Sequence, residues 1–218
     1  MKTHILPICL SLGLLASVSA QENPAKPAAD DAAKAEQETN RVATMKNLRA
    51  IEALLIEFDV DYGSFPDDET AAEVTDATGT DLKFEGGTSN DYFRQLLAGG
   101  GGKSEKPFQF GSPAKRADDK WATTDQAFAK GECDFAYLRG ATASSQPDRP
   151  VVLAPLVPGK MEFDPKPFGG KAVILHVDGS VTAPPINEKG EVIVNGKSLF
   201  DPTQSYWQGK KPEVAWPK

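Results

Sequence analysis

The strongest constraint on the fold is one apolar stripe in the N-terminal third of the chain. Hydrophobic side chains recur there at spacings of three and four residues: Val42, Met45, Leu48, Ile51, Leu55, Phe58 and Tyr62. Such spacing places them on one face of an α-helix, which we expect to run from about Glu36 to Asp61. Gly63 and Pro66 follow directly, and both residue types end helices for steric reasons. The sequence therefore predicts a long amphipathic helix whose apolar face must be covered.

The second half of the chain changes its hydrophobic period. Short runs rich in Val, Ile and Leu, each bounded by Gly, Pro, Asn or Asp, read as strands; they are DFAYLRG (134–140), PVVLAPL (150–156), KAVILHVDGSVTA (171–183) and EVIVNGKSL (191–199). Asp178-Gly179 and Asn195-Gly196 are predicted hairpin turns, because both residue types tolerate positive φ. An antiparallel sheet needs a cover, and the stripe of the helix supplies one. The predicted class is α+β.

The region between the helix and the strands gives weaker signals. Residues 67–90 are polar, with a short helical turn expected over 70–75. A second, short helix is expected over 91–98, capped by Asn90, with Phe93, Leu96 and Leu97 on its buried side. Gly99 to Gly102 then end it.

The first twenty residues have the order of a secretory signal peptide. Lys2 supplies a positive charge, Ile5 to Val18 is almost wholly apolar, and the segment ends in Ser19-Ala20, as signal peptidase requires. The alternative is a retained anchor, but a membrane span needs about 20 apolar residues. Residues 21–35 are rich in Ala, Pro and charge, which predicts a disordered linker. We thus expect a signal peptide (1–20), a linker (21–35) and one domain (36–218) with a loop-rich C-terminal extension, in a periplasmic or secreted protein.

Composition excludes several function classes. The formal net charge is −7, and no Lys/Arg cluster is present, which argues against nucleic acid or anionic membranes as partners. Beyond the leader the chain has one cysteine, Cys133, and one histidine, His176. An intramolecular disulfide and zinc sites made of several Cys and His are therefore excluded.

Two sets of residues are candidates for chemistry. Cys133 and His176 could form a nucleophile–base pair, although acids on both sides of Cys133 raise a thiol pKa and an imidazole within an apolar strand is usually structural. The acids near the helix end hint at a calcium loop, the only cofactor hypothesis, but the glycine position does not fit an EF-hand and a solvated loop is the alternative. These acids are Asp59, Asp61, Asp67, Asp68 and Glu69.

Two further motifs have structural alternatives. The stretch AGGGGKS (98–104) resembles a phosphate-binding loop but has Leu97 where the pattern needs its first glycine, so a flexible loop is the better interpretation. Four aromatic residues lie near the C-terminus and form either a ligand-stacking platform or rings docked on the sheet. They are Phe200, Tyr206, Trp207 and Trp216.

The segment NLRAIEALLIEFDVDYGSFP (47–66) is more specific. It resembles pilin-like proteins, above all the major pseudopilins of type II secretion (general secretion protein G-like). Their pattern at the helix end is filled here by Phe58, Asp61, Gly63, Phe65 and Pro66. The resemblance implies a long helix laid on an antiparallel sheet. It also implies a non-enzymatic role in protein–protein contact, with components of a secretion or surface apparatus as partners.

The N-terminus departs from the pilin pattern. Pilin-like proteins have a short basic leader, cut before a methylated Phe, and an apolar stalk with Glu at its fifth position. This chain has an ordinary signal peptide instead, so we expect a released pilin-like head with no membrane span after cleavage. The alternative function is a small extracytoplasmic enzyme or ligand-binding module that uses Cys133 and His176 or the acidic loop.

Overall fold

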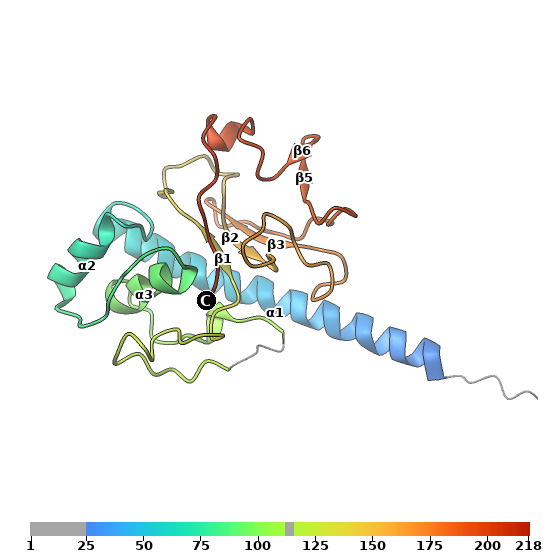
Figure 1. Cartoon of the computed structure of the whole chain (residues 1–218), viewed down its shortest axis with the longest axis horizontal. Helices are drawn as coiled ribbons and strands as arrows, with labels where there is room; N and C mark the ends of the chain where they lie inside the picture. The colour runs from blue at the N-terminus through green and yellow to red at the C-terminus, as the bar shows by residue number, and fades with distance from the viewer. Residues whose placement is uncertain (1–24, 112–115) are drawn as a thin grey trace, which may run out of the picture.

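The computed structural model describes residues 25–111 and 116–218, so the leader expected over 1–20 lies outside the described residues. Three helices come first and short strands follow (Figure 1). The helices are α1 (Ala25–Tyr62), α2 (Thr70–Thr78), α3 (Ser89–Gly99) and two short 3-10 turns, η1 (Lys106–Phe108) and η2 (Ser205–Trp207). The strands are β1 (Ala136–Leu138), β2 (Pro150–Ala154), β3 (Val173–His176), β4 (Val181–Thr182), β5 (Ile193–Val194), β6 (Lys197–Ser198) and β7 (Val214–Ala215).

Helix α1 ends as predicted but begins earlier. Gly63 takes φ +74° and its N–H donates to the Asp59 carbonyl at 2.8 Å, the left-handed termination that glycine favours. The helix begins at Ala25 rather than near Glu36, so the prediction of a disordered linker is wrong from Ala25 onward. Alanine, lysine and glutamate are strong helix formers, and adding turns to an existing helix avoids the cost of nucleation.

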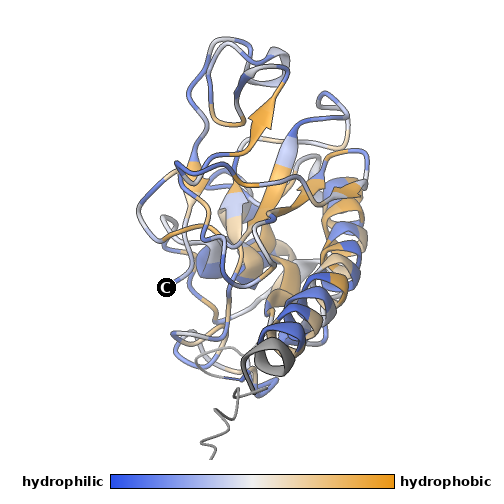
Figure 2. Ribbon diagram, turned by 90° about the vertical axis from the view of Figure 1, so that its right-hand side faces the viewer, coloured by the Kyte–Doolittle hydropathy of each residue, from blue (hydrophilic) through white to orange (hydrophobic). Residues whose placement is uncertain are grey.

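The apolar stripe of α1 is its buried face. Leu48, Ile51, Leu55 and Phe58 are at most 1 % exposed, and Figure 2 shows the polar side of the helix turned away from the sheet. Val42 departs from the expectation, since it is 57 % exposed. The stripe is therefore covered only over the C-terminal part of the helix, while the N-terminal part extends past the body (Figure 1).

The main sheet has five antiparallel strands in the order β4-β3-β2-β1-β7. Asp178 and Gly179 form the turn between β3 and β4, as predicted. Gly179 takes φ +77°, and the Asp178 carboxylate accepts from the Ser180 N–H at 2.9 Å. Asn195 and Gly196, at φ +50° and +78°, join β5 to β6 in a type I′-like turn. That hairpin forms a separate two-stranded sheet.

Both faces of the main sheet are covered. Tyr137, Val152 and Leu175 face the cluster that includes α1 and α3. Leu138, Leu153 and Ile174 face a second cluster, built with side chains of the C-terminal extension; these are Leu199, Phe200, Tyr206 and Trp207. Burial on both faces explains why the strands read as near-continuous apolar runs rather than alternating ones.

Helix α3 and the C-terminus are tied together. The N-cap of α3 is Thr88, in a capping box with Asp91, and not Asn90 as predicted. Asn90 is instead buried and joins two distant segments: its side chain donates to the Phe128 carbonyl and accepts from the Lys218 N–H. Strand β7, which no sequence pattern predicts, reaches this point by pairing with β1.

In the part of the chain that the structure describes, no helix is both long enough and apolar enough to cross a membrane.

Candidate functional site

Residues of the motif at the end of α1 (Phe58, Asp61, Gly63, Phe65 and Pro66) connect the helix to the sheet. Phe58 and Phe65 are buried in the same cluster. The Tyr137 hydroxyl, on β1, donates to the Pro66 carbonyl at 2.8 Å, and the Phe65 N–H donates to the Ala141 carbonyl at 3.1 Å. Asp61 is exposed at the helix end. The motif therefore has a structural role.

Cys133 and His176 each have hydrogen-bond partners of their own. The Cys133 thiol is buried beside the Ser89 hydroxyl and the Phe135 carbonyl, both at 3.7 Å. Burial raises its pKa to about 12, so it is a thiol at neutral pH. Both ring nitrogens of His176 are engaged, with the Asp148 carbonyl at 2.8 Å and the Thr182 hydroxyl at 2.9 Å. This geometry provides neither a thiolate nor a base directed at it.

The acids at the end of α1 bind the loop that follows β1. Asp59 accepts from the Ala143 N–H and Asp67 from the Gly140 N–H, both at 3.0 Å. Asp68 accepts from the Tyr92 hydroxyl at 2.7 Å and pairs with Arg139 at 2.6 Å. These carboxylates therefore hold the loop that follows β1 in place.

The glycine-rich stretch and the C-terminal aromatics also have structural contacts. The N–H groups of Gly100 and Gly102 donate to the Leu96 carbonyl at 3.0 and 3.2 Å, which ends α3. The Tyr206 hydroxyl and the Trp207 indole N–H both donate to the Leu199 carbonyl. Tyr206 and Trp207 therefore fit the second of the two interpretations, in which the rings dock on the body of the protein and do not form a ligand-stacking platform.

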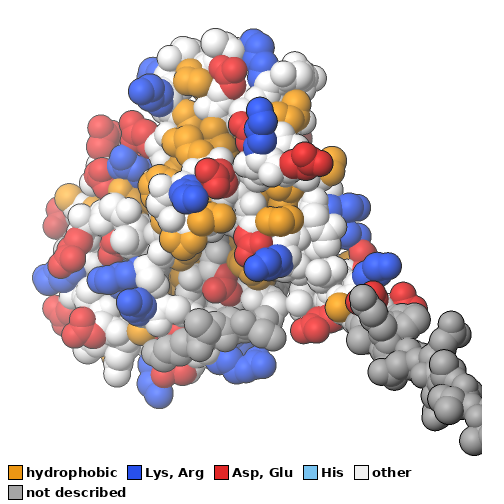
Figure 3. All heavy atoms as spheres, turned by 45° about the vertical axis from the view of Figure 1, so that its right-hand side comes forward, with side chains coloured by type: hydrophobic (Ala, Val, Ile, Leu, Met, Phe, Trp, Pro, Cys, Tyr) orange, Lys and Arg blue, Asp and Glu red, His pale blue; other side chains and the backbone are white. Residues whose placement is uncertain are grey.

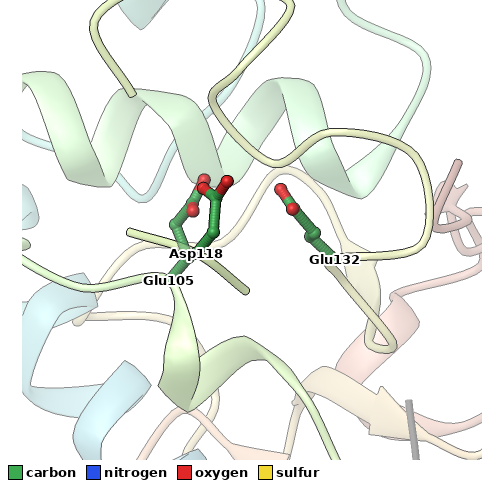
Figure 4. A group of neighbouring side chains, drawn as sticks. All are labelled: Glu105, Asp118 and Glu132. Atoms are coloured by element: carbon green, nitrogen blue, oxygen red, sulfur yellow. The ribbon is translucent and has the colours of Figure 1, made fainter. Parts of the chain in front are cut away.

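Three carboxylates converge in the connecting segment between α3 and β1. Glu105 directly precedes η1, Asp118 lies in the irregular chain after it, and Glu132 precedes Cys133. One oxygen of each lies within 4.8 Å of the others, and Figure 4 shows the three groups directed toward one another. Glu105 and Glu132 are buried and Asp118 is exposed. We call these three residues the carboxylate cluster.

Glu105 is a fully buried member of the carboxylate cluster, and one of its two oxygens has no hydrogen-bond partner. It is 0 % exposed; its Oε1 accepts from the Phe128 N–H, and its Oε2 has no hydrogen-bond partner. Burial raises the pKa of Glu105 above its usual range, and the nearby charge of Glu132 raises it further. The hydrogen bond from the Phe128 N–H lowers this pKa and so opposes the other two effects. The acids come from positions far apart in irregular chain, so no spacing pattern could have predicted their meeting.

A cavity of about 290 Å³ lies between the loop after β1 and the C-terminal extension. Its charged lining residues are Arg139, Arg149, Lys210, Lys211, Asp67 and Glu213. Arg149 also lies over the Trp207 ring, 5.5 Å from its centroid. Basic side chains outnumber acidic ones here although the chain as a whole is acidic, which suits a small anion.

Comparisons with models of known protein families, with curated proteins and with solved structures find no match for this chain.

Proposed function

We propose that this is a non-enzymatic, extracytoplasmic protein with a pseudopilin-like domain, which acts by protein–protein contact as an accessory of a secretion or surface apparatus. The observation that carries the proposal is helix α1. Its C-terminal part packs beneath an antiparallel sheet through the motif residues, while residues 30–36 are all exposed. A projecting helix of this kind offers a contact surface that the body of the protein does not use.

The surface is consistent with a protein partner. On the face shown in Figure 3, hydrophobic side chains gather in a band, with Lys, Arg, Asp and Glu of both signs around it. Apolar surface with a charged rim is typical of protein contact sites. Neither sign of charge dominates this face, unlike a nucleic-acid-binding surface.

The chemistry of Cys133 and His176, the candidate nucleophile–base pair, favours a non-enzymatic role. Cys133 is buried with a pKa of about 12, and His176 has both nitrogens bonded to neighbours. The signal-peptide pattern of residues 1–20 supports a periplasmic or secreted location.

Site-specific photo-crosslinking in the native host tests the contact proposal. A photoreactive residue replaces Lys34 or Val42 on the exposed part of α1, and Lys189, exposed in the turn before β5, serves as the control position. We expect a discrete adduct with an envelope protein from the α1 positions and none from Lys189. If no position gives an adduct, the proposal is wrong.

A ligand-binding module is the second candidate function, favoured by the basic cavity. Titration calorimetry with inorganic phosphate and with mono- and dicarboxylates tests it. Binding of one of these anions should weaken by about tenfold, or about 1.4 kcal/mol, in the double variant Lys210→Ala/Lys211→Ala. Lys189→Ala, which removes one positive charge outside the cavity, should leave the affinity unchanged. Heat changes that are the same for all three proteins would exclude the cavity as the site.

A further inference from the structure

We propose that the carboxylate cluster of Glu105, Asp118 and Glu132 binds one calcium ion, which fastens the connecting segment between α3 and β1. This site is distinct from the acids at the end of α1, and it does not depend on the proposed function.

The spacing of the oxygens fits one ion. One oxygen from each residue lies within 4.8 Å of the other two. Calcium binds carboxylate oxygens at about 2.3–2.6 Å, so two ligands of the same ion lie up to about 5 Å apart. An ion between the three groups in Figure 4 is therefore within reach of all of them.

Glu105 supplies an independent observation that points to a ligand. Its Oε2 is fully buried, has no hydrogen-bond partner and belongs to a carboxylate directed into the cluster. A buried polar atom without a hydrogen-bond partner is rare in folded proteins, and a bound ion is one of the ordinary explanations. A cation bound in the cluster would satisfy this oxygen and compensate the charge of the buried carboxylate.

The donor set selects calcium among the common cations. All three ligands are hard carboxylate oxygens, which suit Ca²⁺, Mg²⁺ and Mn²⁺ rather than the softer metals. Mg²⁺ demands a near-ideal octahedron and retains several waters, whereas Ca²⁺ accepts irregular geometry and more protein ligands. Side chains from three separate stretches of irregular chain form an irregular site. The exposed Asp118 leaves one side open for the ion to enter.

The location gives the ion a structural role. Among the described residues between α3 and β1 (100–111 and 116–135), the only regular element is the 3-10 turn η1, so few repeated backbone hydrogen bonds hold that part of the chain. Glu105 and Glu132 lie near its two ends, and an ion shared by them closes the segment. Because binding requires the folded segment, calcium should stabilise the protein.

Calcium titration of the full mature chain, stripped with EDTA, tests the proposal by calorimetry and by thermal unfolding. We expect one Ca²⁺ per chain and a higher Tm with calcium. Glu105→Gln keeps an oxygen that can accept from the Phe128 N–H, and Asp118→Asn changes an exposed side chain, so both variants should fold. Each should weaken calcium binding by at least about tenfold and reduce the rise in Tm. Asp125→Asn, an exposed acid of the same segment, should behave as the parent protein.

Two outcomes would overturn the proposal. The first is that the stripped protein takes up no calcium at millimolar concentration while Glu105→Gln raises the Tm. In that case a proton shared between the carboxylates, and not a calcium ion, holds the cluster together. If calcium binds with equal affinity to the parent chain, Asp118→Asn and Asp125→Asn, the ion lies at another site.

Discussion

At the scale of single residues, a few buried polar groups join segments that are distant in sequence. Tyr137 reaches from β1 to the carbonyl of Pro66, and Asp134 accepts from the Phe110 N–H at 2.9 Å. Each bond fixes a loop that has no ladder of backbone bonds to hold it. Removing one partner of a buried hydrogen-bonded pair costs more free energy than the bond itself contributes, because the remaining group has neither water nor protein to form a hydrogen bond with.

Tyr137→Phe should therefore destabilise the protein by about 1–2 kcal/mol, since it leaves the Pro66 carbonyl buried without its donor. Urea unfolding of the parent and the variant measures the difference. Tyr62→Phe removes a hydroxyl from a partly exposed ring and should change the free energy of unfolding by less than about 0.5 kcal/mol. Equal effects of the two substitutions would show that the Tyr137–Pro66 bond does not hold the end of α1.

Asp134 should make stability depend on pH between about 4 and 6. Burial raises its pKa from 3.8 to about 6, with the bond from Phe110 opposing. The folded state therefore holds a proton that the unfolded state has already lost in this range. The stabilising contribution is complete below the unfolded pKa and disappears as the pH rises through the folded pKa.

Comparison with Asp134→Asn isolates this effect. Between pH 4 and pH 7 the parent should lose about 2 kcal/mol relative to the variant, whose amide oxygen can still accept from Phe110. Chemical denaturation at several pH values measures the difference. A constant difference across this range would contradict the raised pKa.

At the scale of elements, α1 contributes to stability through one face. Leu55 is 1 % exposed in the core, whereas Val60, on the opposite side of the helix, is 79 % exposed. Leu55→Ala should cost about 3 kcal/mol, because it removes buried methyl groups and leaves a cavity. Val60→Ala should stay within about 0.5 kcal/mol. Thermal and urea unfolding of the pair measure both values, and a comparable loss in Val60→Ala would mean that the outer face is also packed.

The elements predicted from sequence are those with a local signal. The spacing of Leu48, Ile51 and Leu55 predicted α1, and Gly63 predicted its end. The start at Ala25 differs from the predicted start near Glu36, because residues of high helix propensity extend a helix beyond its apolar stripe. The cap Thr88 was missed because neighbouring Thr and Asn are both good N-caps. Strand β7 is only two residues long. It forms because it pairs with β1, and a local sequence pattern does not predict such a long-range pairing.

At the scale of the whole molecule, the candidate sites arise from contacts between distant segments. Glu105, Asp118 and Glu132 meet only after the segment between α3 and β1 has folded back on itself. Docking of the C-terminal aromatics on the sheet was one of two predicted alternatives, but the sequence does not show which face of the sheet Tyr206 and Trp207 cover. The layered α+β class was predictable, since a helix stripe and apolar strands must cover one another.

The two functional proposals differ in what they need from the rest of the molecule. Calcium binding uses a site within the body, so it should be measurable on the purified chain. Contact through α1 requires that the helix reach its partner, and hence that the protein leave the cytoplasm. Export therefore limits the proposal of contact through α1 but not the proposal of calcium binding.

Export gives the prediction that concerns the whole chain. Because Val18-Ser19-Ala20 follows the apolar run, signal peptidase should cleave after Ala20, and N-terminal sequencing of the native protein should begin at Gln21. Ala20→Arg should block cleavage, because the enzyme accepts only a small residue there, and should leave a longer, membrane-associated form. Ala29→Arg, which adds the same charge beyond the cleavage site, should be processed normally. A native chain that begins at Met1 in the membrane fraction would establish a retained anchor, and one found intact in the cytoplasm would refute export.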